Sequence, residues 1–480
     1  MKDILLKAYD PARFRELGYQ LVDFLADYLH GVQNEKLGRV TQWETPDKSY
    51  EFWEDDWLKG DRTKIIDFFQ QLTATSIHLH HPKYAGHQIS PPVPLAALGG
   101  LMADFLNNGM GVYEMGQSST ALERLVLREC AKAMGLSPST EGVLTSGGSL
   151  ANLTALLAAR SNRSKDKVWT DGTKSRLALM VSEEAHYCVE RAVRIMGWGS
   201  EGIIKVPTDD QFRMRTELLE EYLEKAREDG LEVIAIVGSA CSTSTGAFDD
   251  LRAIGSFCEQ HDLWFHVDGA HGVPLAFSKK HRHFVAGLDT ADSIAMDFHK
   301  MLMVPAVTTA LLFKDSASSY RTFMQDAHYL WQKNEEEEWF NVAKRSFECT
   351  KLMMSVKVYA TLRTYGFELF EAYVDQVVAN AKLFSKLIKA HPKMELAVEP
   401  ACNIVCFRYV ADEQSDISQA NEQIRQSMLE EGPFYIVKTN LKGDTWLRCT
   451  LSNPFTSESD LQELLERVEE MGEGDGAESA

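Results

Sequence analysis

One lysine in this 480-residue chain follows an apolar segment and is itself surrounded by apolar residues. The stretch at residues 293–305 reads SIAMDFHKMLMVP, in which His299 and Lys300 come directly after SIAMDF. Burying an ammonium group costs several kcal/mol unless it is paired or neutralised, and a neutral lysine can react with a carbonyl group. Many such lysines only mark the point where a strand leaves the core and the amine reaches water. Lys300 is a candidate for forming a Schiff base, provided that other residues complete a site.

An aspartate ends a second apolar segment, thirty-two residues earlier (300 − 268 = 32). This segment, at residues 263–272, reads LWFHVDGAHG and carries Asp268. Open α/β sheets bind ligands at the carboxyl ends of their strands, which is where this aspartate would lie. Pyridoxal phosphate (PLP) needs a lysine to hold its aldehyde and an acid to keep its pyridine nitrogen protonated, so that the ring accepts electrons. Lys300 and Asp268 together predict this cofactor.

Three further motifs precede this pair in the chain. They are TSGGSLANL at residues 145–153, SEEAHYCVERA at 182–192 and STSTGAFDDLRAI at 242–254. Together with HVDGAH and DFHKM, they resemble the motifs of the group II pyridoxal-phosphate-dependent amino-acid decarboxylases. That family includes glutamate, cysteine-sulfinate, 2,4-diaminobutyrate and aromatic-L-amino-acid decarboxylases. The resemblance covers nearly the whole chain and implies a carboxy-lyase that converts an L-amino acid to its amine and CO2.

The resemblance also implies which residues form the site. Catalytic roles fall on Lys300, His186 and Asp268. The cofactor-binding residues that it implies are Gly148, Ser149, His186, Thr243, Asp268, Ala270, His299 and Lys300.

The TSGGS motif precedes a predicted helix, and the first N–H groups of a helix, together with its dipole, stabilise a phosphate dianion. By resemblance, Gly148 and Ser149 contact the phosphate, and Ser146 and Asn152 are further candidates. A glycine-rich turn of this kind is often no more than a tight turn. The phosphate role therefore depends on the other motifs.

Four side chains are implied to surround the cofactor ring. His186 would stack on the pyridine face and help to protonate the substrate carbon, although a lone histidine after a strand is more often a helix cap. Thr243 would hydrogen-bond near the phenolic oxygen, and Ala270 would lie beneath the ring. His299 would orient groups of the cofactor or the substrate.

Two features depart from the pattern of many relatives. Asp297 stands three residues before the lysine, where many relatives have asparagine, and a carboxylate would repel a nearby phosphate unless it is paired or turned away. Residues 331–343, which include four consecutive glutamates at 335–338, are predicted to form a mobile, exposed loop. The loop has no tyrosine, and Tyr329 stands only at its root. Relatives without a loop tyrosine form an aldehyde, so a decarboxylation-dependent aldehyde synthase is an alternative. The stacking histidine, kept here as His186, favours simple decarboxylation instead.

The substrate class is predicted from residues 77–94, IHLHHPKYAGHQISPPVP. In relatives this stretch lines the substrate pocket, which indicates His87 and Gln88. Relatives that act on aromatic substrates carry aromatic side chains near these positions, so the polar pair favours a polar or acidic aliphatic amino acid over an aromatic one. The four histidines of the stretch have no carboxylate or cysteine at ligand spacing, so no metal is predicted.

The elements that must position these residues alternate between strands and helices. The predicted strands are 177–181, 203–206, 233–237, 263–267, 293–296 and 308–313, followed by 394–398, 403–409, 434–437 and 446–451. The predicted helices are 11–32, 118–134, 187–196, 215–229, 251–261 and 457–471, with others from Leu150 and from Phe367. This order predicts an α/β fold with a mostly parallel sheet and helices on both faces, and the resemblance implies the fold of type I PLP-dependent enzymes.

Four domains or segments are predicted along the chain. They are an N-terminal helical segment with the substrate-lining loop (1–110), a large PLP-binding domain (111–375), a small α+β domain (376–471) and a disordered tail (472–480). The helix at 11–32 has a wide apolar stripe. By resemblance this stripe packs on a partner subunit, which implies a homodimer, and packing within the same chain is the alternative.

The bulk composition narrows the function classes further. With 50 basic and 70 acidic residues, the net charge of −20 argues against binding to nucleic acid or to anionic membranes. No apolar run reaches the roughly 18 residues of a membrane helix and the N-terminus lacks the order of a signal peptide, so a cytoplasmic protein is predicted. The eight cysteines lack CxxC spacing and are predicted to be reduced core thiols. A non-catalytic relative, and transamination or sulfur elimination on the same fold, are the alternative functions.

Overall fold

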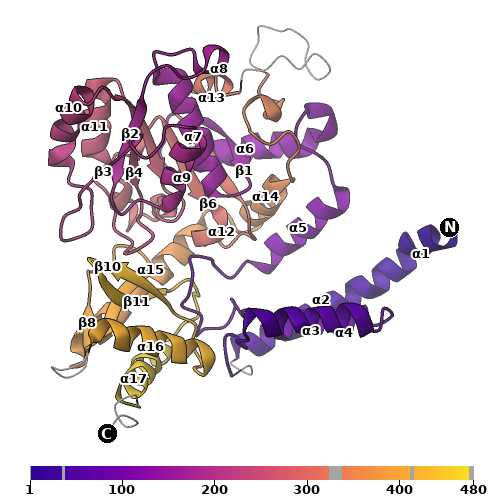
Figure 1. Cartoon of the computed structure of the whole chain (residues 1–480). Helices are drawn as coiled ribbons and strands as arrows, with labels where there is room; N and C mark the ends of the chain where they lie inside the picture. The colour runs from indigo at the N-terminus through magenta and orange to yellow at the C-terminus, as the bar shows by residue number, and fades with distance from the viewer. Residues whose placement is uncertain (1, 35–37, 324–337, 411–415, 475–480) are drawn as a thin grey trace. The chain divides into compact units, whose positions relative to one another are not determined.

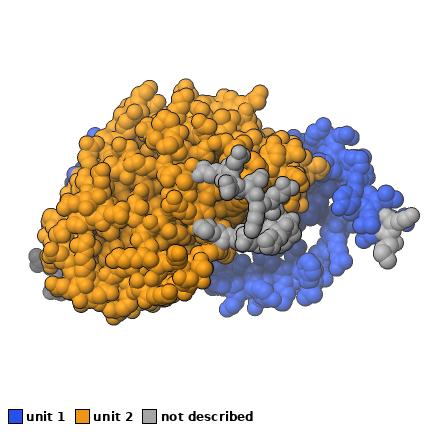
Figure 2. Space-filling view, turned by 90° about the horizontal axis from the view of Figure 1, so that it is seen from above, with its two compact units in different colours: residues 1–87, 383–397, 406–480 blue, residues 88–382, 398–405 orange. Residues whose placement is uncertain are grey.

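The computed structural model of the chain describes residues 2–34, 38–323, 338–410 and 416–474 (Figure 1). These residues group into two compact units (Figure 2). Unit 1 consists of Met1–His87, Leu383–Ala397 and Cys406–Ala480, and unit 2 consists of Gln88–Lys382 and Val398–Val405. The domain boundaries given above stay a prediction.

Unit 2 contains a seven-stranded sheet in the order β1-β7-β6-β5-β4-β2-β3. The strands are β1 (Glu141–Thr145), β2 (Leu177–Ser182), β3 (Ile203–Val206), β4 (Glu232–Ser239), β5 (Trp264–Asp268), β6 (Ser293–Asp297) and β7 (Thr309–Phe313). The pairs from β3 through β6 are parallel, whereas β7 runs antiparallel to both β6 and β1. The predicted α/β fold with a mostly parallel sheet is confirmed.

Helices cover this sheet because its central strands are apolar on both faces. Every residue of β2, β5, β6 and β7 is buried, which is the pattern of strands between two helical layers. The helix α7 (Gly148–Arg163) packs across five strands and also contacts α9 (Tyr187–Ile195), while α10 (Leu219–Glu228) and α11 (Leu251–His261) pack on β4. Figure 1 shows these two pairs on opposite sides of the strands.

Of the remaining helices, α6 (Gln117–Ala133) also packs on this sheet, at β1 and β7. The others are α1 (Lys2–Ala8), α2 (Pro11–Gln33), α3 (Pro46–Lys59), α4 (Ile65–Ala74), α5 (Pro94–Leu106), α8 (Val168–Asp171), α12 (Phe298–Met301), α13 (Ala317–Tyr320), α14 (Met354–Tyr365), α15 (Glu368–Ala390), α16 (Ile417–Glu430) and α17 (Glu458–Gly474). The short 3-10 helices are η1 (Tyr113–Met115), η2 (Thr216–Leu218), η3 (Val273–Phe277), η4 (Arg282–Val285), η5 (Leu288–Thr290) and η6 (Val342–Lys344).

A second sheet has four strands in the order β10-β11-β9-β8. They are β8 (Met394–Leu396), β9 (Ile404–Tyr409), β10 (Val437–Leu441) and β11 (Asp444–Thr450). The strand predicted at 434–437 is wrong in its position, because the strand found there, β10, begins only at Val437. Residues 433–435 are instead held by bonds from Val40 N to Pro433 O and from Ala85 N to Tyr435 O within unit 1. An apolar run there packs against loops rather than joining the sheet.

Several local predictions need correction. The predicted helix at 215–229 is divided into η2 and α10, and the elements that were not predicted include α3, α4, α14, α16 and β1. Of the predicted exposed loop, residues 331–337 lie outside the described residues, but Glu338 is buried because Lys344 Nζ lies 2.7 Å from its Oε2. The helix α17 reaches Gly474, inside the tail predicted to be disordered, and residues 475–480 lie outside the described residues. Seven of the eight free cysteines are buried, whereas Cys349 is exposed.

Two absences hold for the part of the chain that the structure describes. None of its helices combines the length and apolar composition needed to cross a lipid bilayer. None of its groups of three or more His, Cys, Asp and Glu side chains could hold a metal ion.

Candidate active site

A cavity of about 160 Å³ lies in unit 2 among the residues that follow its parallel strands. Its lining residues are Gly148, Ser149, Asn152, His186, Cys188, Ser239, Cys241, Thr243, Asp268, Ala270, His271, Asp297, His299 and Lys300. All eight residues that the resemblance assigns to the cofactor are among them. They meet because the carboxyl ends of parallel strands share one edge of the sheet.

Lys300 lies in the short helix α12, directly after β6. Its Nζ lies 2.9 Å from Oδ2 of Asp297, and its side chain keeps 23% of its exposure. Burial opposes the charge of this amine, but the neighbouring Asp297 carboxylate outweighs burial and raises the pKa of Lys300. The lysine is therefore a partly buried, paired cation that faces the cavity.

The Asp297 carboxylate, which would repel a nearby phosphate if it were unpaired, has two partners within the protein. It is 1% exposed, and besides Lys300 it accepts a hydrogen bond from the Thr309 hydroxyl. Thr309 is the first residue of β7 and pairs in register with Asp297, the last residue of β6. Because this carboxylate is paired with a cation and a hydroxyl, its charge is largely satisfied within the protein.

The turn before α7 depends on two glycines. Gly147 has a φ of 120°, a backbone conformation that side chains disfavour. A Cβ on Gly148 would stand 3.2 and 3.3 Å from the Asp297 carboxylate oxygens and 3.4 Å from Cβ of Ala270. The glycines thus let the N-terminus of a 16-residue helix open directly onto the cavity.

Asp268 ends β5 and retains 9% exposure. Its Oδ2 accepts a hydrogen bond of 2.9 Å from Asn152 Nδ2, and its Oδ1 accepts one of 3.3 Å from Ala270 N. Asn152, considered above as a phosphate contact, is instead a partner of Asp268. In the sequence, the one sign of this pairing is that Asn152 stands one turn into the helix that follows the glycine turn.

His186 is a helix cap that also faces the cavity, and its role toward the cofactor stays a prediction. It caps α9, since its Nδ1 accepts a hydrogen bond from Cys188 N at 3.3 Å, and it also lines the cavity. Burial lowers its pKa, so the ring favours its neutral form. His299 is buried, with Nδ1 3.2 Å from Thr308 O and Nε2 3.7 Å from Asp297 Oδ2.

Neither of the two predicted substrate-lining residues is among those that line the cavity, and the two belong to different units. His87 belongs to unit 1, where its ring lies 6.1 Å from that of Tyr435. Gln88 belongs to unit 2, and two residues later Ser90 N and Ser90 Oγ donate to the His299 carbonyl oxygen at 3.2 and 3.3 Å. The segment with Gln88 therefore runs beside the residue that precedes Lys300.

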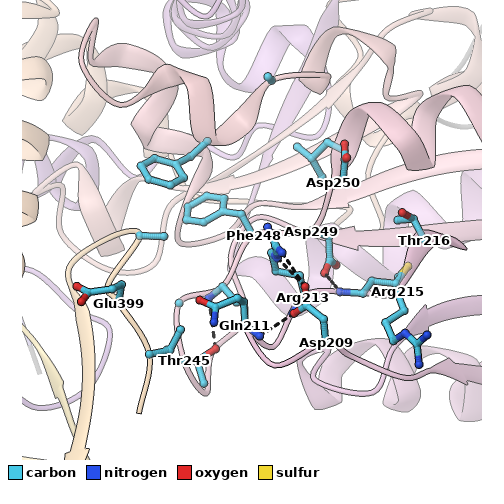
Figure 3. Close-up of a pocket in the computed structure, with 18 of the residues that line it drawn as sticks. Asp209, Gln211, Arg213, Arg215, Thr216, Thr245, Phe248, Asp249, Asp250 and Glu399 are labelled. Carbon is cyan, nitrogen blue, oxygen red and sulfur yellow. Dashed lines mark hydrogen bonds and ion pairs between the residues drawn. The ribbon is translucent and has the colours of Figure 1, made fainter. Parts of the chain in front are cut away.

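A larger cavity of about 660 Å³ lies beside the loops after β3 and β4 (Figure 3). Two ion pairs lie in its wall, Arg213 with Asp209 at 2.7 Å and Arg215 with Glu217 at 2.8 Å. The Asp249 carboxylate accepts hydrogen bonds from the backbone N–H groups of Met214 and Ser239. None of the residues described in its wall is a lysine, so this cavity does not supply an amine for carbonyl chemistry.

Comparison with known proteins identifies the family. Residues 59–410 match the family model described as "Pyridoxal-dependent decarboxylase conserved domain". The chain belongs to the pyridoxal-dependent decarboxylases. It is therefore a carboxy-lyase that acts on an amino acid, and its cofactor is pyridoxal 5′-phosphate.

Relatives of this decarboxylase act on different kinds of substrate. It is 28% identical to an L-aspartate decarboxylase of Metarhizium robertsii over 87% of this chain and 86% of that protein. It is 25% identical to an aromatic-L-amino-acid decarboxylase of Bacillus atrophaeus over 96% of this chain and 95% of that one. The solved structure of mouse CSAD in apo form has a TM-score of 0.84 and 26% identity, over 94% of this chain and 99% of that one.

The residues of the cavity fit this cofactor. An amine at Lys300, a carboxylate at Asp268 and the open N-terminus of α7 provide partners for an aldehyde, a pyridinium nitrogen and a phosphate. Ala270 offers a small side chain between them. The decarboxylase thus carries a partner group for each of the cofactor's three polar ends.

Replacing Asp297 with asparagine should change how the decarboxylase takes up its cofactor. Loss of the carboxylate lowers the pKa of Lys300, so more of its amine is neutral near neutral pH and reacts faster with an aldehyde, by up to about tenfold for each pKa unit lost. The rate at which apoenzyme and pyridoxal phosphate develop visible absorbance, measured from about pH 6 to about pH 10, tests this. Thr309→Val removes a partner of the same carboxylate but keeps the charge, and should leave the pH profile nearly unchanged. An Asp297→Asn profile that coincides with the wild-type profile would contradict the pairing.

Proposed function

We propose that this decarboxylase converts a polar or acidic aliphatic L-amino acid, such as glutamate, aspartate, cysteine sulfinate or 2,4-diaminobutyrate, to its amine and CO2. The side-chain nitrogen of Gln88 carries the proposal, because this Nε2 is buried and has no hydrogen-bond partner among the described residues. A buried donor of this kind costs free energy unless a ligand satisfies it. An oxygen of a polar substrate side chain would do so, whereas an aromatic ring would leave the donor unpaired.

The residues of the cavity take the following proposed roles. The bound cofactor supplies the electron sink for the bond that breaks when CO2 leaves. Lys300 would hold the cofactor through its amine and would be released when the substrate amine binds. Asp268 keeps the proton on the ring nitrogen, and Gly148 and Ser149 hold the phosphate. His186 would lie over the ring, and because burial lowers its pKa it would first have to take up a proton before it delivered one to the substrate carbon.

Two alternatives to this proposal are an aromatic substrate and an aldehyde product. The aromatic-L-amino-acid decarboxylase relative supports an aromatic substrate, and the absence of a loop tyrosine supports an aldehyde product. Tyr329 and Trp331 lie outside the described residues. Trp339 lies 4.3 Å from the Arg124 guanidinium, and Phe340 packs on Tyr113 at 5.6 Å. Neither of these two rings lines the cavity.

A homodimer is part of the proposal. Val32 is the one residue of α2 that is buried within this chain. Large apolar side chains are exposed on α1 to α3, among them Leu5, Phe14, Val22, Leu25, Trp57 and Leu58. Apolar surface of this extent marks an interaction site, and light scattering of the full chain would test a second copy as its occupant. The predicted cytoplasmic location stays a prediction.

A decarboxylation screen tests the substrate class. The holoenzyme is given each proteinogenic amino acid, cysteine sulfinate and 2,4-diaminobutyrate, with CO2, amine and aldehyde all quantified. We expect amine from an aliphatic polar substrate, and a Gln88→Leu variant should raise its KM by about 10-fold or more because a hydrogen bond is lost. Faster turnover of tyrosine, tryptophan or dopa than of every aliphatic candidate would overturn the substrate class. Aldehyde with peroxide in place of amine would overturn the product.

A further inference from the structure

A chain of buried polar side chains runs through the sheet of unit 2 to the Asp268 carboxylate. Trp264 Nε1 donates to Ser293 Oγ, Ser293 Oγ lies against His266 Nδ1, His266 Nε2 against Asn152 Oδ1, and Asn152 Nδ2 donates to Asp268 Oδ2, each at 2.9 Å. We propose that this chain positions Asp268 for the cofactor's ring nitrogen, with Asn152 and His266 as positioning residues. The inference rests on the proposed role of Asp268.

The chemistry of its ends gives the chain one direction. An indole N–H can only donate, so Ser293 accepts from Trp264 and has its own hydrogen left to donate to His266 Nδ1. A neutral imidazole that accepts at Nδ1 donates at Nε2, here to the Asn152 oxygen. At the other end, an ionised carboxylate can only accept. Every hydrogen bond of this series is therefore donated in the direction of Asp268, and each of its polar groups has a hydrogen-bond partner.

One competing arrangement exists. His266 Nδ1 also lies 3.2 Å from the Ser293 carbonyl oxygen and could donate to it. His266 Nε2 would then have to accept, which requires the Asn152 amide to turn and place its oxygen against the Asp268 carboxylate. Two acceptors facing each other in a buried site repel. The charge of Asp268 thus selects the direction described above.

Neutrality of His266 is essential to this role. The side chain has no exposed surface, and burial lowers its pKa to about 4. A protonated imidazole would place a positive charge behind Asp268 and compete with the positively charged ring nitrogen for the same carboxylate. A neutral chain stabilises the carboxylate by hydrogen bonds alone, so its full charge remains available to the cofactor.

The chain also fixes which carboxylate oxygen is available. Asn152 is 1% exposed and uses one amide hydrogen on Asp268 Oδ2, while its Nδ2 also lies 3.1 Å from Cys188 Sγ. Oδ1 accepts only the long bond of 3.3 Å from Ala270 N among the contacts described, and a carboxylate oxygen can accept a second donor. The ring nitrogen is therefore expected at Oδ1.

Variants of the two positioning residues test the inference. Asn152→Leu and His266→Phe remove the hydrogen bonds, whereas His266→Gln keeps an N–H donor near the position of Nε2. We expect the first two to weaken the affinity of the apo protein for pyridoxal phosphate by about 10- to 100-fold and to lower kcat more than they raise KM. His266→Gln should recover most of both quantities. Equilibrium dialysis, steady-state kinetics and thermal unfolding of each apo protein provide the readouts.

A matched control separates positioning from loss of stability. Asn421 is also fully buried and bonds to Tyr409 N, Tyr409 O and Ile417 O in unit 1. Asn421→Leu should lower the unfolding temperature without changing cofactor affinity. If a bulky variant does not fold, Asn152→Ala, which adds no volume, carries the test.

The outcomes are distinguishable. Wild-type cofactor affinity and kcat in Asn152→Leu or His266→Phe, or a His266→Gln enzyme as impaired as His266→Phe, would overturn the positioning role. If Asp268→Asn also keeps wild-type activity, the proposed role of Asp268 fails instead.

Discussion

Replacing Lys300 with alanine should abolish the visible absorbance of the bound cofactor and lower CO2 release by roughly 10⁴-fold. Lys300 Nζ is the one amine that lines the cavity among the described residues, so no neighbouring lysine replaces it. The loss of this partly buried cation also leaves Asp297 without its ionic partner. A visible spectrum and a CO2 assay of the purified variant measure both effects.

Two further substitutions separate chemistry from folding. Lys300→Arg keeps a cation beside Asp297 but cannot be deprotonated in proteins, so we expect a folded and inactive enzyme. Lys314→Ala removes an exposed lysine at the end of β7 and should match the wild type. Retention of the visible band in Lys300→Ala, or its loss in Lys314→Ala, would show that the cofactor is held elsewhere.

Replacing Asp268 with asparagine should lower kcat by about 10²- to 10³-fold while the protein still binds its cofactor. An amide can hydrogen-bond to the ring nitrogen but does not stabilise its positive charge, which is needed most as CO2 leaves. The effect should therefore fall on kcat, with KM for the amino acid nearly unchanged. Steady-state kinetics and the visible spectrum of the variant give the measurement.

Asp250→Asn is the matched control for this loss of charge. Asp250 caps α11, with its side chain accepting from Ala253 N, and asparagine caps a helix as well as aspartate does. The control should keep both stability and activity. Turnover near the wild-type value in Asp268→Asn would mean that another group stabilises the electron sink.

Much of the fold and most of the site could be predicted because they depend on local sequence. The predicted bounds of β3 and α11 coincide with those in the structure, since apolar runs and periodicity define such elements. The eight predicted cofactor residues meet in one cavity because each follows or begins an element at the same edge of the sheet. Their individual roles stay proposals.

What could not be predicted depends on contacts between distant residues. Thr309 reaches Asp297 only because β7 runs antiparallel to β6, and a short apolar strand carries no sign of its direction. Asn152 reaches Asp268 across 116 positions (268 − 152). Glu338 is buried because Lys344 pairs with it, so a run of acidic residues was an unreliable guide to exposure.

The place of β1 in the sheet also affects the order in which the protein can fold. This strand lies at the edge of the sheet and pairs with β7, where Thr145 is opposite Thr309, 164 residues later (309 − 145). Because the chain is synthesised from its N-terminus, β1 is complete long before β7 has been made. Closing the large loop between these two strands is slow. The glycine turn that opens α7 onto the cavity follows directly on β1, so the strand that leads into this turn has no partner in the described sheet until β7 has been made. Pairing of the strand that leads to the phosphate end of the site is therefore a late event in folding.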